Sequence, residues 1–273
     1  MAHIPRIRHR TPYVAVDVDA TFMTPVPEIS RSNAYSFIEC CESGQVAFFC
    51  TGRGREESLR ILYDLYDGFP AYQGYPGVYH SGAIVIDKNG KIIHATYFSP
   101  HATEHIVDAI RYMCHETMTI FCSFDRWLVL SEHTKILDCE LKNSNNHMPL
   151  YSCTRDEIIG TEISQILVYR YKDISMPFVV YDNVYFRIRR DRRPFVQLTP
   201  LGVSPSQGIW NLLKHYGIGT KMFSYVGHHC DIEDLPVMEG DNQNNNIVEQ
   251  QSESKNVVRV VNNENCIRHT KTA

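Results

Sequence analysis

The chain has 273 residues, with 43% hydrophobic and 21% charged side chains and a formal net charge of −4 at pH 7. This balance predicts a folded protein with one large domain or two smaller ones. The acidic charge gives no electrostatic reason to expect nucleic acid as a partner. No apolar run approaches the roughly 18 residues of a membrane span, so no membrane partner is expected.

The cysteines and the N-terminus indicate the compartment. The nine cysteines show neither the regular spacing of a disulfide framework nor the CxxC pair of a structural zinc site. Residues 1–10 are basic but lack the apolar segment of a secretory signal peptide. We therefore expect a reducing, cytoplasmic environment.

The first predicted element is a strand that ends in two carboxylates. Residues 14–18 form a β-branched, almost continuous apolar run, which predicts a parallel strand buried on both faces. Asp17 and Asp19 lie at its C-terminal end, where open α/β sheets place ligands. Burying two carboxylates is costly unless a cation or hydrogen bonds compensate. The structural alternative is a solvated, aspartate-rich turn.

Strands and helices then alternate. Pro25 and Pro27 predict a loop after the first strand, and Ser30 or Ser32 is a candidate N-cap for the helix that follows. The next expected elements are a helix at residues 33–42, a buried strand at 46–50 and a helix at about 56–66. This order predicts βαβ units on a parallel sheet.

The junction between that second strand and its helix has the composition of an anion site. Thr51, Gly52 and Arg53 supply a hydroxyl, a glycine that lets the backbone approach a ligand, and backbone N–H groups at a helix N-terminus. Such a tripeptide is common in turns. Its significance here comes from its position at the end of the strand that follows the Asp17 strand.

The middle of the chain has a different pattern. Residues 83–93 contain two apolar runs around an Asn-Gly turn, which predicts a β-hairpin. A helix at 103–115 and strands at 118–122, 127–130, 165–171 and 177–180 are expected to follow, with a loop at 143–149. The basic cluster at 187–193 is expected to be a solvated loop or strand edge. Together these elements predict an inserted α+β unit.

The parallel-sheet pattern is expected to return near the C-terminus. Ser204 and Pro205 suit the N-cap and first position of a helix over residues 206–216. A strand at 222–226 then precedes an acidic, histidine-rich loop at 227–234. His228 and His229 suit a site or a solvated loop about equally. Residues 241–255 are polar and predict a surface segment, and 257–261 predict a last short strand.

In this order the pieces resemble the haloacid dehalogenase superfamily, specifically its Cof-type phosphatases with an α/β cap. The resemblance covers almost the whole chain. The matching segments are DVDAT at 17–21, TGR at 51–53, SGA at 81–83, LTPLGVS at 198–204 and EDLP at 233–236. The implied fold is an α/β, Rossmann-like parallel-sheet core, residues 1–81 and 191–273, with an inserted α+β cap at 82–190.

The resemblance also implies a function, a Mg²⁺-dependent phosphatase acting on a small phosphorylated metabolite such as a sugar phosphate or nucleotide. Asp17 is the implied nucleophile, which forms an aspartyl-phosphate, and Asp19 the general acid and base. Thr51, Gly52 and Arg53 are the implied phosphate-binding residues. The implied magnesium ligands are Asp17, the backbone carbonyl of Asp19, and Asp231 or Asp234.

Two positions depart from the family pattern. Pro205 stands where the family carries a lysine, and His228 stands where its fourth motif has an aspartate. Loss of the lysine would cost transition-state stabilisation, and a histidine would suit a softer metal. Lys221, Arg53 or the cluster at 187–193 could supply the missing charge. A catalytically degenerate protein that binds a phosphorylated ligand or protein partner therefore stays as the alternative, and the sequence leaves substrate and oligomeric state open.

Overall fold

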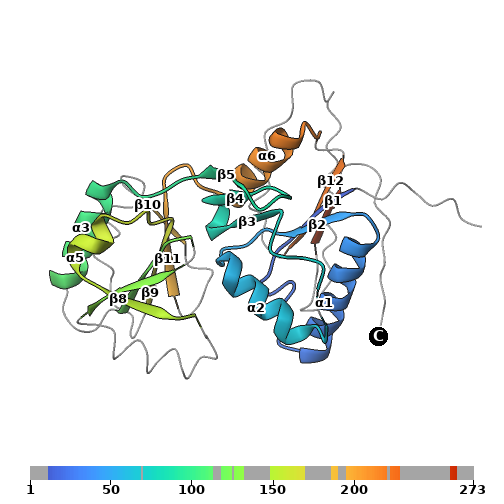
Figure 1. The fold of residues 1–273 in the computed structure, drawn as a ribbon, viewed down its shortest axis with the longest axis horizontal. Coiled ribbons are helices and arrows are strands. Elements are labelled where there is room, and N and C mark those ends of the chain that lie inside the picture. The colour runs from blue at the N-terminus through green and yellow to red at the C-terminus, as the bar shows by residue number, and fades with distance from the viewer. Residues whose placement is uncertain are drawn as a thin grey trace, which may run out of the picture.

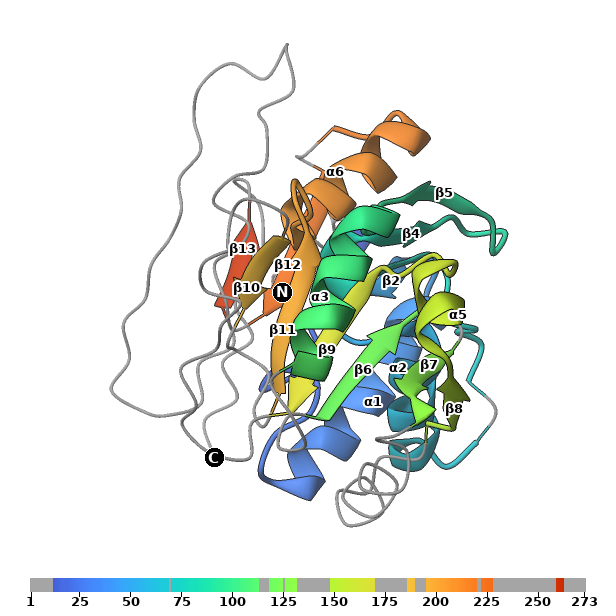
Figure 2. The same ribbon diagram turned by 90° about the vertical axis from the view of Figure 1, so that its left-hand side faces the viewer.

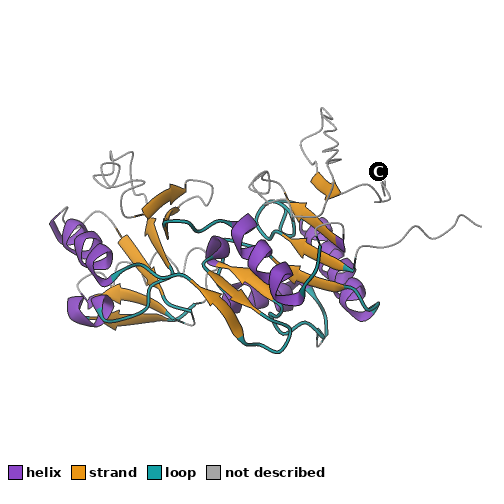
Figure 3. Ribbon diagram, turned by 90° about the horizontal axis from the view of Figure 1, so that it is seen from above, coloured by secondary structure: helices purple, strands orange, loops and turns teal. Residues whose placement is uncertain are grey.

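The computed structural model describes residues 12–68, 70–112, 118–124, 126–131, 148–169, 186–189, 195–219, 222–227 and 259–262. These residues form two lobes, on the right and left of Figure 1. Seen from above, in Figure 3, the strands of the two lobes lie in separate halves, with loops crossing between them. Among the described helices, none has the length and apolar character needed to cross a bilayer.

The first lobe is built on a four-stranded sheet in the order β13-β12-β1-β2. Its central strand β1 (Tyr13–Val16) pairs in parallel with both β2 (Val46–Phe49) and β12 (Phe223–Gly227). The edge strand β13 (Arg259–Asn262) is antiparallel to β12. The C-terminal ends of three strands therefore meet at one edge, which is where the parallel-sheet pattern predicts a site.

Three helices and a small sheet complete this lobe. Helices α1 (Pro27–Glu42) and α2 (Arg55–Leu65) follow β1 and β2, and α6 (Pro205–Tyr216) packs on the three-stranded sheet β3-β4-β5. That sheet consists of β3 (Gly77–Tyr79), β4 (Ile84–Ile86) and β5 (Ile92–Ala95), and the 3₁₀ turn η1 (His80–Gly82) lies between its first two strands. Buried side chains of the three helices, β3 and β4 share one hydrophobic cluster, and partly buried side chains of β5 pack against it.

The second lobe is a six-stranded sheet, order β10-β11-β9-β6-β7-β8, covered on one face by α3 (Pro100–Tyr112) and α5 (Arg155–Ile159) (Figure 2). Its strands are β6 (Met118–Cys122), β7 (Trp127–Leu130), β8 (Leu150–Cys153), β9 (Gln165–Tyr169), β10 (Phe186–Arg189) and β11 (Phe195–Pro200). Alternation decides which side chains face the helices. Ile166 and Val168 of β9 pack in the cluster that includes α3, whereas Gln165 and Leu167 lie on the opposite face.

Most expected elements are present, and the first helix shows an instructive error. We expected Pro27 in a loop, but α1 begins at Pro27 with Val26 at the N-cap position. A proline costs nothing at the first helical position, where its missing N–H would have no intrahelical partner. Ser30 caps nothing, and its hydroxyl instead accepts from Thr24 N at 2.8 Å. Elements β3, β8 and α5 carry no strong sequence pattern and were not predicted. Residues 187–189 of the basic cluster lie on β10 at the edge of its sheet, which is the strand-edge alternative, and residues 190–193 lie outside the described residues. The strand expected at 177–180 also lies outside them.

The packing also bears on where the inserted unit begins and ends. The hairpin of β4 and β5 is antiparallel, as the Asn-Gly turn predicts, but Ile84, Val85 and Ile86 pack in the hydrophobic cluster of the first lobe. Conversely β11, which we expected to belong with the core, pairs with β9 and β10 in the second lobe. We therefore propose that the inserted unit runs from about residue 96 to residue 200.

Candidate active site

Asp17 directly follows the central strand of the first lobe. Its backbone N–H donates to Val226 O at 2.9 Å, so the ladder between β1 and β12 extends to this residue. One carboxylate oxygen of Asp17 accepts from Val18 N at 2.7 Å. The side chain is half-buried. Asp17 thus lies at the carboxyl edge of the sheet, between the ends of two parallel neighbours.

A tight turn after Asp17 directs Asp19 toward the second strand. Ala20 has a positive φ of 56°, and Met23 N donates to Val18 O at 2.8 Å, which closes the turn. The Asp19 side chain is 44% exposed. Both aspartates therefore lie on the same edge of the sheet, but they have different partners.

The loop of Thr51, Gly52 and Arg53 leaves β2 at that edge. Thr51 is buried and donates its N–H to Val78 O at 3.0 Å, while its hydroxyl oxygen accepts from Arg53 N at 3.2 Å. A Cβ on Gly52 would lie 3.2 Å from both Gln197 Oε1 and Ser81 Oγ. A side chain at position 52 would therefore crowd these two polar groups.

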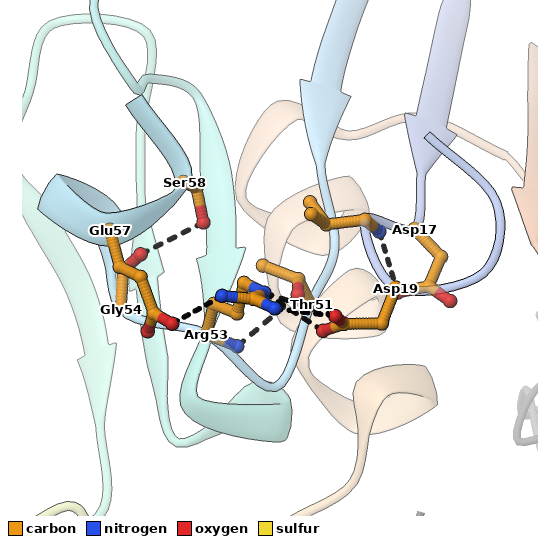
Figure 4. Close-up of polar contacts among 8 residues, drawn as sticks. Asp17, Asp19, Thr51, Arg53, Gly54, Glu57 and Ser58 are labelled. Carbon is orange, nitrogen blue, oxygen red and sulfur yellow. Dashed lines mark hydrogen bonds and ion pairs between the residues drawn. The ribbon is translucent and has the colours of Figure 1, made fainter. Parts of the chain in front are cut away.

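The guanidinium of Arg53 bridges two carboxylates, as Figure 4 shows. Its Nε lies 2.9 Å from Asp19 Oδ2 and its Nη2 lies 2.6 Å from Asp19 Oδ1, while Nη1 donates to Glu57. Burial opposes the charge of Arg53, but the carboxylates of Glu57 and Asp19 outweigh that effect and raise the pKa of Arg53 above its ordinary value. Arg53 is therefore a fixed cation beside Asp19.

Glu57 is a site residue that the sequence analysis missed. It is one helical turn after Arg53, and its side chain is only 5% exposed. Arg53 lies just before Gly54, the N-cap residue of α2, and Glu57 lies in the first turn of the helix, so the Arg-x-x-x-Glu spacing across the helix start is the signal that could have identified it.

The segment before α6 has the expected cap. Ser204 is the N-cap residue, and its hydroxyl accepts from Gln207 N at 3.1 Å, while Pro205 is the first helical residue. Pro205 therefore contributes helix geometry and no charge. Lys214, further along α6, is exposed and lines a cavity of about 310 Å³ together with Ile93, His94, Asn211 and His215.

Five candidate site residues named from the sequence lie outside the described residues, namely Lys221, His228, His229, Asp231 and Asp234. In the described ranges, no group of three or more His, Cys, Asp or Glu side chains is arranged to hold a metal ion. The donors at the sheet edge, the Asp17 carboxylate and the backbone carbonyl of Asp19, are hard oxygen ligands. Their chemistry fits Mg²⁺, which takes one or two carboxylates and keeps several waters.

Comparison with known proteins gives the family. Residues 14–233 match the model of the haloacid dehalogenase-like hydrolases. Over 241 residues the chain is 25% identical to the chloroplastic endoribonuclease YBEY of Arabidopsis thaliana, an alignment that takes in 82% of this chain and 39% of the plant protein. The chain thus spans about two fifths of the length of that curated relative.

Solved structures agree with the fold. A haloacid dehalogenase-like hydrolase from Bacteroides thetaiotaomicron superposes with a TM-score of 0.66 at 14% identity, covering 83% of this chain and 85% of that one. A HAD/COF-like hydrolase from Plasmodium vivax superposes with a TM-score of 0.61 at 22% identity, covering 80% of this chain and 78% of that one. A HAD subclass IIB sugar phosphatase superposes with a TM-score of 0.56 at 16% identity, covering 77% of this chain and 78% of that one. At these identities the likeness shows the fold.

Proposed function

The chain belongs to the haloacid dehalogenase-like hydrolases, and we propose that it is a Mg²⁺-dependent phosphatase that hydrolyses a small phosphorylated metabolite. The observation that carries the proposal is the pair Asp17 and Asp19 at the carboxyl edge of the parallel sheet, with Arg53 bonded to Asp19. A carboxylate nucleophile, a second carboxyl group beside it and a fixed cation are groups that can perform phosphoryl transfer through an aspartyl-phosphate.

In the proposed reaction Asp17 attacks phosphorus, and a new bond forms between its carboxylate oxygen and the phosphoryl group while the ester oxygen leaves. Asp19 protonates that leaving oxygen. It then accepts a proton from the water that attacks the aspartyl-phosphate, which releases inorganic phosphate and restores Asp17. Asp17 is the nucleophile throughout and Asp19 changes from general acid to general base, so both carboxyl groups end each cycle unchanged.

The phosphoryl oxygens are proposed to bind the Thr51 hydroxyl and the Gly52 N–H. Because the Thr51 oxygen already accepts from Arg53 N, its own proton is directed elsewhere and can be donated to an anion. Arg53 supplies positive charge that Pro205 cannot provide. A protein that only binds a phosphorylated ligand would need the same charge, so turnover is favoured over the catalytically degenerate alternative by the intact pair Asp17 and Asp19.

Magnesium is proposed to be held by Asp17, the carbonyl of Asp19 and a carboxylate from Asp231 or Asp234. When bound, it would neutralise charge on the transferring phosphoryl group. The second lobe is proposed to act as the cap that closes over the site and selects the substrate. A sugar phosphate is the favoured class, because one structural neighbour is described as a sugar phosphatase.

The test is hydrolysis of p-nitrophenyl phosphate with and without Mg²⁺. We expect metal-dependent turnover that Asp17→Asn lowers by at least about 10³-fold, because the amide cannot act as nucleophile. Asp64→Asn, an exposed position on α2, is the matched control and should leave the rate unchanged. Turnover unaffected by Asp17→Asn would contradict the mechanism. Phosphate binding without turnover of any phosphate ester would favour the degenerate alternative.

A further inference from the structure

The three carbonyl oxygens of the phosphate loop, Thr51 to Arg53, are each bonded to a donor outside it. Thr51 O accepts from Ser81 N at 3.0 Å, and Arg53 O accepts from His80 N at 3.1 Å. Gly52 O accepts from Gln165 Nε2 at 2.8 Å. The first two donors are backbone groups of the same lobe. The third is a side chain of β9, in the second lobe.

This third bond fixes one peptide unit. The carbonyl and the N–H of a peptide point in opposite directions, so a donor on Gly52 O orients the N–H of Arg53 away from Gln165. That N–H donates to Thr51 Oγ1 at 3.2 Å. Gln165 therefore acts on Thr51 through one rigid peptide, and the orientation of the Thr51 hydroxyl depends on a residue of the other lobe.

The environment of Gln165 indicates that the donated bond is its main contribution. The residue is 1% exposed and lies on the sheet face opposite α3. Its Oε1 is buried and has no hydrogen-bond partner among the described residues. Burying an unpartnered carbonyl costs stability, and an apolar side chain of the same size, such as methionine, would avoid that cost.

We propose that Gln165 is a positioning residue for the phosphate loop, so that the anion site is complete only when the second lobe is in place against the first. The inference rests on the proposed function, because it assigns Thr51 and Gly52 to phosphate binding. It adds that phosphate affinity is coupled to the contact between lobes through a single amide. Substrate selection by the second lobe and phosphate binding by the first would then share one hydrogen bond.

Gln197 offers a matched control. It is also a 1% exposed glutamine on the same face of the six-stranded sheet, and it also donates to the first lobe. Its Oε1 lies close to Gly52, where an added Cβ would meet it at 3.2 Å, and its Nε2 bonds Ser81 Oγ at 2.7 Å, but Nε2 makes no described bond to a carbonyl of the phosphate loop. If these bonds only join the lobes, losing either one should lower phosphate affinity equally. If the bond from Gln165 positions the loop, its loss should lower phosphate affinity more than the loss of the bond from Gln197.

The experiment compares Gln165→Met and Gln197→Met with the wild type. Binding of inorganic phosphate is measured by titration calorimetry in magnesium buffer, and hydrogen exchange is measured on a peptide covering residues 51–54. We expect Gln165→Met to weaken phosphate binding about 3- to 10-fold, the effect of one neutral hydrogen bond, and to speed exchange of the loop. Gln197→Met leaves every described bond to the carbonyls of the phosphate loop in place, so it should change both quantities clearly less than Gln165→Met does. Gln165→Asn, whose amide ends one methylene short of Gly52 O, repeats the test if the methionine variant does not fold.

The outcomes separate the two proposals. Wild-type phosphate affinity in Gln165→Met, or equal losses in both variants, would overturn the positioning role and leave the phosphatase proposal intact. A wild type that binds no phosphate would overturn the proposed function. In that case the hydrogen-exchange comparison still decides whether Gln165 orders the loop.

Discussion

At the scale of single residues, the central feature is a guanidinium shared by two unequal carboxylates. Glu57 is 5% exposed and Asp19 is 44% exposed, and both bind Arg53. The buried partner anchors the arginine to α2, and the other partner is accessible to solvent. An arginine suits this arrangement because its planar fork donates to two carboxylates at once, which a lysine cannot do with the same geometry.

Replacing this arginine should separate activity from stability. Arg53→Met should lower kcat/KM for p-nitrophenyl phosphate by about 10²–10³-fold, the effect of one preorganised transition-state donor, and should also destabilise the fold because Glu57 stays buried without its cation. The double variant Arg53→Met, Glu57→Met should recover stability, since an apolar pair removes the buried charge, but should not recover activity. Steady-state kinetics and urea denaturation measure the two effects.

Arg55→Met is the control for that pair of variants. Arg55 is the next arginine, and it binds Glu56 and Gln73 O rather than Asp19. Its loss should leave kcat/KM within about threefold of the wild-type value, because an ion pair of this kind near the surface contributes little energy. Equal losses in Arg53→Met and Arg55→Met would show that positive charge in general, and not the Arg53 contact, supports the reaction.

At the scale of elements, the turn η1 joins the loop of residues 51–53 to α6. His80, Ser81 and Gly82 have successive positive φ values of 50°, 56° and 100°. Such a run is unfavourable for side chains other than glycine. Hydrogen bonds from His80 N to Arg53 O and from Ser81 N to Thr51 O stabilise it. The turn also approaches Ser204, which caps α6, so three segments far apart in sequence meet at η1.

Glycine at position 82 is required by that approach. A Cβ there would lie 2.0 Å from Ser204 O, so the backbone must move to accept Gly82→Ala. We expect a loss of more than about 3 kcal/mol in the free energy of unfolding, from left-handed strain plus overpacking. Gly202→Ala is the control, because Gly202 also has a positive φ, 75°, but a Cβ there meets nothing within 4 Å. Gly202→Ala should lower the free energy of unfolding by only about 1–2 kcal/mol. Equal losses in the two variants would contradict the role of the close approach to Ser204.

At the scale of the whole molecule, the two lobes have separate hydrophobic cores. The cluster around Phe49 and the cluster around Val168 share no residue. The lobes are joined by the half-buried Phe124 of the second lobe, which packs against the first cluster, and by buried polar bonds. These bonds come from Gln165, Gln197 and the pair His80 Nδ1 and Ser164 Oγ, which are 2.7 Å apart. Polar contacts of this kind allow the lobes to separate at lower cost than a continuous apolar core would.

Separate cores should unfold separately. Phe49 is fully buried and stacks on Phe37 with ring centroids 4.6 Å apart, so Phe49→Ala should destabilise the first lobe by about 3–5 kcal/mol. The chain has two tryptophans, Trp127 on β7 and Trp210 on α6, one in each lobe. The Trp127→Phe background leaves Trp210 as the only tryptophan whose fluorescence reports unfolding, and the Trp210→Phe background leaves Trp127. We expect Phe49→Ala to lower the unfolding midpoint reported by Trp210 and to leave the midpoint reported by Trp127 unchanged. Equal shifts at both tryptophans would mean that the lobes unfold as one unit.

The sequence by itself determined the family, the α/β fold and the local elements with strong patterns. The apolar run before Asp17, the Asn-Gly hairpin and the Ser204–Pro205 helix start are specified by residues close together in the chain, and the structure contains all three. Such features are predictable because strand alternation, turn geometry and capping depend on neighbours within a few positions.

Only the tertiary structure decided which elements share a core and which side chains meet at the site. An apolar strand has the same pattern in either lobe, so β4 and β11 could not be assigned from sequence. Gln165 bonds a residue 113 positions away, and nothing in its own neighbourhood marks a glutamine as a donor to the phosphate loop. Contacts of this range depend on how whole sheets pack against each other, and that packing is set by the sum of many weak apolar contacts rather than by any local motif.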